Sequence, residues 1–83
     1  MSQRSQTPDE RFLISLYRAA EKKGDLFSLF DSREIARTVG LKETALKNIV
    51  KHLAQANFVK KVDPASIYLT QRGCDFVLNE LSN

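Results

Sequence analysis

Residues 31–73 decide the fold, and they read DSREIARTVG LKETALKNIV KHLAQANFVK KVDPASIYLT QRG. The first part predicts a short helix over 31–39, because Asp31 is a good N-cap and apolar residues follow at helical spacing. Gly40 supplies the left-handed backbone that a tight turn needs. A second, longer helix is expected over 42–56, with Asn57 as a left-handed C-cap. The sequence therefore predicts two helices joined by a tight turn.

The second part of this stretch predicts a β-hairpin and a final helix. Residues 58–62 and 66–69 are rich in β-prone side chains, and Asp63-Pro64 marks a turn between them. Thr70 is expected to begin the last helix, which runs over 71–82 and includes three apolar residues, Val77, Leu78 and Leu81.

The residues before this stretch predict a scaffold helix. Thr7-Pro8-Asp9-Glu10 has the pattern of a capping box with proline in the first turn, and Gly24 should end the helix. Residues 26–30 are too short for a helix and are interpreted as a short strand or packed connector. Its two aromatic residues, Phe27 and Phe30, are expected in the core.

Length and composition predict one small domain. With 83 residues, of which 42% are apolar, the chain should hold a single core over 7–83, preceded by a flexible tail over 1–6. The single cysteine, Cys74, excludes an internal disulfide and favours a cytoplasmic location. No apolar run approaches the roughly 20 residues of a membrane span, and the start lacks the pattern of a signal peptide.

Positive charge is concentrated in the middle of the chain. Residues 32–61 contain seven basic residues against two acids, so this part carries +5 whereas the remainder of the +3 chain carries −2. Such a distribution is typical of a surface that faces a polyanion, although a solvated charged face would look the same.

The predicted helix 42–56 has two distinct faces. At about 100° per residue, four apolar residues form one stripe, Leu46, Ile49, Val50 and Leu53. The opposite face carries only polar side chains, Thr44, Lys47, Asn48, Lys51 and Gln55. Lysines can neutralise phosphates, and threonine and asparagine can bond base edges. A helix pair followed by a hairpin is used by many proteins to place one helix in the DNA major groove.

Catalysis and cofactor binding have little support in the sequence. There is no Ser-His-acid set, no glycine-rich phosphate loop and no motif for a small-molecule ligand, so we expect no enzyme and no cofactor. His52, at the edge of the apolar stripe, has no second histidine or cysteine nearby, which argues against a metal. Cys74 is expected to be a small core residue, with a redox role as the alternative. Tyr17 and Tyr68 could stack on a base, but packing is favoured for both.

Segment 34–78 resembles the winged helix-turn-helix family, in particular the MarR-like small prokaryotic transcription regulators. The matching residues lie in the helix pair, at the end of the second helix and at the entry to the last helix. They are Ile35-Ala36, Val39-Gly40-Leu41, Leu46, Val50, Leu53, Asn57-Phe58-Val59, Tyr68-Leu69-Thr70 and Gly73. The resemblance implies a mainly helical α+β fold with a small β-hairpin, in the order helix, short strand, helix, helix, strand, strand, helix.

Carried over to this chain, the family role makes 42–56 the DNA-reading helix and the hairpin its wing. The expected DNA-binding residues are Arg33, Lys42, Thr44, Lys47, Asn48, Lys51, Gln55, Lys60 and Lys61. Two features depart from the family. The wing turn has no arginine for the minor groove, so the wing is expected on the DNA backbone, and long dimerisation helices are missing.

We therefore expect a transcription regulator that binds double-stranded DNA. A homodimer reading two half-sites is compatible with this function, and the first and last helices are the candidate dimer surfaces. The alternative is a winged-helix module that binds another protein without binding DNA, because a fold does not fix a function. An exposed apolar patch opposite the helix 42–56 would favour that alternative or a dimer interface.

Overall fold

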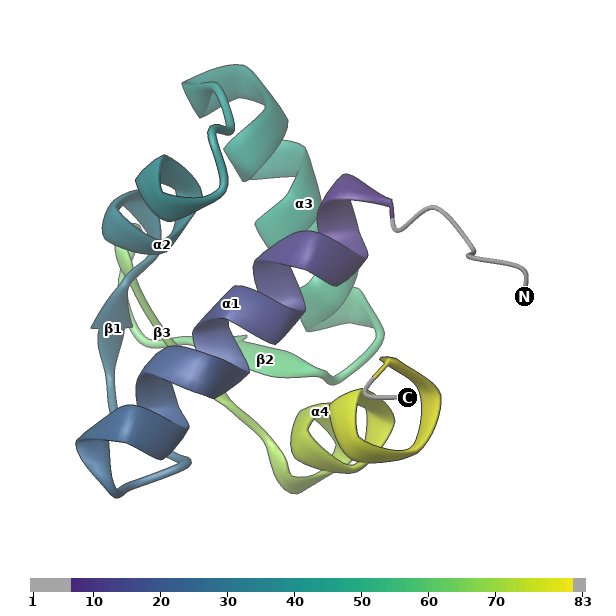
Figure 1. Cartoon of the computed structure of the whole chain (residues 1–83). Helices are drawn as coiled ribbons and strands as arrows, with labels where there is room; N and C mark the ends of the chain where they lie inside the picture. The colour runs from purple at the N-terminus through teal and green to yellow at the C-terminus, as the bar shows by residue number, and fades with distance from the viewer. Residues whose placement is uncertain (1–6, 82–83) are drawn as a thin grey trace.

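The computed structural model describes residues 7–81, so the expected tail over 1–6 and the predicted last residue of the final helix, Ser82, lie outside the described residues. It begins with helix α1 (Pro8–Lys23), which crosses the front of the molecule in Figure 1. Thr7 and Glu10 form the predicted capping box, and Gly24 ends the helix at φ 87°. Four apolar side chains of α1 are buried, Phe12, Leu13, Leu16 and Ala20.

The connector after α1 turns over residues 25–28 and ends in a two-residue strand, β1 (Phe30–Asp31). In the turn, the N–H of Phe27 donates to the Asp25 carboxylate at 3.0 Å, and the N–H of Ser28 donates to the Asp25 carbonyl oxygen at 3.2 Å. The prediction that Phe27 is a core residue is wrong, because its side chain is 47% exposed in this turn, whereas Phe30 is partly buried against the core. Ser28 is buried and Leu29 is exposed.

The predicted helix pair is present as α2 (Ser32–Thr38) and α3 (Glu43–Gln55). Asp31 caps α2 by accepting a hydrogen bond from the backbone N–H of Arg33 at 2.9 Å. Gly40 adopts φ 72° in the turn between the two helices, as the sequence predicts. The turn sets α3 at an angle to α2, with both helices against α1 (Figure 1).

The wing consists of β2 (Val59–Lys61) and β3 (Ser66–Leu69), and Asn57 precedes it with φ 66°. β3 also pairs with β1, so the antiparallel sheet has the order β1-β3-β2. Alternate wing residues, Val59, Ile67 and Leu69, are buried in the core beneath α1 and α3. The core thereby fixes the position of the wing relative to α3.

The end of the chain differs from the single predicted helix. Thr70 caps α4 (Gln71–Phe76), as expected, but the chain then continues as a π-helix, η1 (Val77–Leu81). In this segment Val77 is buried and Leu78 is 49% exposed. Short π-helical segments have no sequence pattern that would reveal them.

Cys74 lies in the core, as predicted, and burial raises the pKa of its thiol. A thiol of this kind is poorly reactive. Within residues 7–81 no helix combines the length and apolar character that crossing a membrane requires.

Candidate nucleic-acid interface

Helix α3 separates an apolar face from a polar face, as the sequence predicts. Its four apolar residues are buried in the core, and its polar residues are exposed, namely Thr44, Lys47, Asn48, Lys51 and Gln55. Lys42, at the N-cap, is also exposed and makes no side-chain cap. His52 was expected at the edge of the buried face, but it is exposed, and its Nδ1 lies 3.6 Å from the carboxylate of Asp9 in α1.

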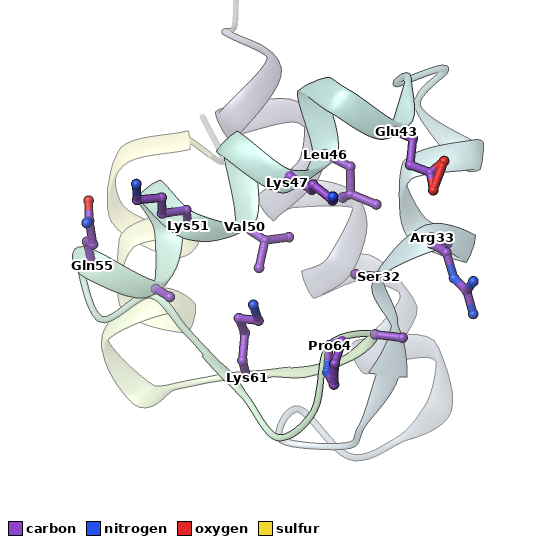
Figure 2. A pocket seen from close by; sticks show the side chains of 12 residues that line it. Ser32, Arg33, Glu43, Leu46, Lys47, Val50, Lys51, Gln55, Lys61 and Pro64 are labelled. Carbon is purple, nitrogen blue, oxygen red and sulfur yellow. The ribbon is translucent and has the colours of Figure 1, made fainter.

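A groove of about 730 Å³ runs between α3 and the wing. One wall is α3, the other is formed by β2 and the wing turn, and the start of α2 closes one end (Figure 2). The floor contains apolar side chains of α3, Leu46, Val50 and Ala54. The groove therefore runs along the side of α3 that faces the wing.

The groove is predominantly basic. Lys47 and Lys51 line it from α3, and Lys61 extends from the wing towards α3 on the other side (Figure 2). Arg33 adds a fourth cation at the α2 end, where Glu43 is the one acid among the lining residues. Three lysines on two facing walls create a positive channel that suits an anionic chain.

The strand pattern distinguishes two neighbouring lysines that the sequence treats alike. Lys61 shares the inward side of β2 with buried Val59 and lines the groove, whereas Lys60 lies on the opposite side of the strand. Lys60 is paired with Tyr68 in the sheet and does not line the groove. The two adjacent lysines therefore place their charges on opposite sides of β2.

The α2 end of the groove is electrostatically balanced. Arg33 forms an ion pair with Asp31 at 3.4 Å, and its hydrogen bonds hold the pKa of the Asp31 carboxyl below the ordinary value. The same pairing raises the pKa of Arg33, and Glu43 adds to this effect. Both side chains are exposed, so the pair is weak and Arg33 can exchange Asp31 for another anion.

The wing turn is held by Asp63 and not by a basic residue. Its carboxylate accepts hydrogen bonds from the backbone N–H groups of Ala65 at 3.0 Å and Ser66 at 2.8 Å. These bonds lower the pKa of Asp63. The turn therefore carries a fixed negative charge, which opposes insertion into the minor groove of DNA.

Five of the nine sequence-predicted binding residues line the groove, namely Arg33, Lys47, Lys51, Gln55 and Lys61. Thr44 and Asn48 share the exposed face of α3 outside it, and Lys42 lies at the start of that helix. The sequence did not single out Ser32, Pro64 or Ala65, which also line the groove. These three are uncharged and are brought to α3 by tertiary packing, so no local pattern indicates them.

No protein-family model, curated protein or solved structure matches this chain. Its class is therefore defined by topology. Three helices followed by an antiparallel hairpin form a small α+β domain that is consistent with winged-helix topology.

Proposed function

We propose that this protein is a DNA-binding transcription regulator of the MarR-like winged-helix type, with α3 in the major groove and the wing on the sugar–phosphate backbone. The observation that carries the proposal is the basic groove between α3 and the wing. The major groove, about 12 Å wide, admits one α-helix. A helix docked there brings a phosphate strand along each of its sides, and the α3–wing groove would receive one of them.

The side chains divide into two roles. Lys47, Lys51 and Lys61 would neutralise phosphates, because they face the same channel from two walls. Thr44 and Asn48 would contact base edges from the exposed face of α3. The α3 face has no arginine, which is the commonest reader of guanine, so we expect a modest sequence preference for one copy of the domain.

The second candidate is a winged-helix module that binds a protein without binding DNA. It is favoured by the exposed aromatic and aliphatic side chains of the α1–β1 connector, Phe27 at 47% and Leu29 at 50%. These residues belong to a segment that does not line the α3–wing groove. The same side chains would also serve a homodimer interface.

A salt titration of binding to random-sequence duplex DNA, followed by selection from a randomised pool, distinguishes the candidates. The proposal predicts binding that weakens steeply with salt and an enriched motif. A two-fold symmetric motif would establish a dimer on two half-sites. Salt-dependent binding without any motif would replace regulation with a non-specific DNA role, and no binding at low salt would leave the protein-binding module.

A further inference from the structure

A second basic groove, of about 600 Å³, lies between α1 and α2. It shares no lining residue with the α3–wing groove. Figure 1 views the molecule with α1 in front, whereas in Figure 2 α3 and the wing lie in front of α1. The two grooves therefore face different sides of the molecule, and both could be occupied at once.

The α1 wall of this groove is a row of cations. Arg11, Arg18 and Lys22 all line it, and no acid does. Spacings of seven and four residues place the three side chains on one side of the helix, over a length of roughly 16 Å. Arg18 and Lys22 are like charges at i and i+4, an arrangement that destabilises an isolated helix.

Structural roles account for only part of this row. Arg11 donates a hydrogen bond from Nη2 to the carbonyl oxygen of Val39 at 2.8 Å, which ties α1 to the end of α2. Lys22 is in the last turn of α1, where a cation is favoured by the helix dipole. Arg18 has neither role. In the part of the chain that the structure describes, no carboxylate forms an ion pair with Arg18 or Lys22.

The other lining residues are mainly aliphatic. Ile14 and Ala19 come from α1, and Ile35 and Val39 from α2 and its end. The cations lie on the α1 wall alone, and the α2 wall contributes Ile35, Thr38 and Val39, so this groove lacks the two facing basic walls of the α3–wing groove. It suits an amphipathic helix, whose apolar residues enter the groove while its acidic residues meet the rim.

We propose that the α1–α2 groove binds an acidic amphipathic segment of a partner protein. Apolar side chains of the segment lie over Ile14 and Val39, and its carboxylates pair with Arg18 and Lys22. The proposal does not rest on DNA binding. If α3 does bind DNA, the groove on the other side provides a contact through which the bound protein can engage a second protein.

The test uses the full chain and a fluorescein-labelled peptide of about 15 residues, with leucines at helical i, i+4, i+7 and i+11 spacing and glutamates flanking them. A scrambled peptide of the same composition is the matched probe. Binding is followed by fluorescence anisotropy, and the site is mapped by two-dimensional amide NMR.

The double variant Arg18→Gln/Lys22→Gln removes the free cations and leaves Arg11 in place. Lys23→Gln/Arg72→Gln removes the same charge at exposed residues that line neither groove.

We expect amide shifts confined to residues 11–22 and 35–39, and weaker binding of the scrambled peptide. Arg18→Gln/Lys22→Gln should weaken binding about fivefold, and the control variant should change it by less than about twofold. The proposal is overturned by no binding at about 1 mM peptide, by shifts on α3 and the wing, or by equal losses in the two variants. Amide shifts in the same groove with duplex DNA would replace the protein partner by nucleic acid.

Discussion

Gly73 is the position at which one added carbon should damage the fold most clearly. It is buried in α4, and a Cβ there would lie 2.1 Å from the carbonyl oxygen of Phe58. That oxygen accepts a hydrogen bond from the N–H of Thr70 at 3.1 Å, and the Phe58 ring stacks on Phe76 with centroids 4.5 Å apart. The clash is therefore with backbone that is held on both sides.

The expected effect of Gly73→Ala can be worked from two opposing contributions. Helix propensity alone would stabilise the variant by about 1 kcal/mol. The Phe58 carbonyl oxygen must move about 1 Å away from the added Cβ, and this shift strains α4 against the wing. The strain costs more than the roughly 1–3 kcal/mol that overpacking usually costs. We expect a net loss of about 3 kcal/mol, which lowers the Tm of a domain of this size by roughly 12–24 °C.

Thermal and urea unfolding followed by circular dichroism measure this loss. Gly24→Ala is the control, because Gly24 has φ 87° and no atom within 4 Å of the added Cβ. It should lose only about 1 kcal/mol from the left-handed backbone. A Gly73→Ala variant as stable as the parent would refute the close approach of α4 to Phe58.

Three further predictions concern α3 and the wing. Lys61→Ala should weaken DNA binding about three- to tenfold at low salt, whereas Lys60→Ala should have a smaller effect. Titrations of the two variants side by side measure this difference, and equal effects would mean that the groove does not hold the DNA backbone. Asn48→Ala should broaden the sequence preference in a pool selection while keeping the salt dependence, and an unchanged motif would remove Asn48 from base reading. Asp63→Ala should destabilise the protein at neutral pH, because the folded-state pKa of Asp63 is lowered from its ordinary value of 3.8 and its contribution is present above that pH. The difference from the parent should shrink as the pH falls below 3.8 and vanish below the lowered folded-state pKa of Asp63, and a difference that grows in acid would contradict the role of the carboxylate.

Local signals in the sequence predicted most of the elements correctly. Thr7, Asp31 and Thr70 are N-caps in the structure, and Gly24, Gly40 and Asn57 have the positive φ expected of them. These residues act through their own backbone or through neighbours two or three residues away, so the local sequence contains the information needed to predict them. The exposed polar face of α3 follows equally from helical periodicity.

The features that the sequence did not reveal depend on distant parts of the chain. Phe27 and Phe30 look equivalent in the sequence, but Phe27 lies in the turn over 25–28 and is exposed, whereas Phe30 pairs with Ile67 of β3 and is partly buried. Lys60 and Lys61 differ only because β2 packs Val59 inward. The α1–α2 groove is lined by residues from segments 11–22 and 35–39. These segments are distant in the sequence and form one groove only because the two helices pack together.

The most direct test of the proposed function is the salt dependence of DNA binding by Lys47→Ala/Lys51→Ala. Both lysines line the α3–wing groove, and each phosphate contact contributes about 0.9 to the slope of log K against log salt. The double variant should therefore bind more weakly, with a slope reduced by about 1.8. The control Lys23→Gln/Arg72→Gln, which removes the same charge outside the groove, should keep nearly the parental slope. If the two double variants gave the same slope, α3 would not be the helix that binds DNA.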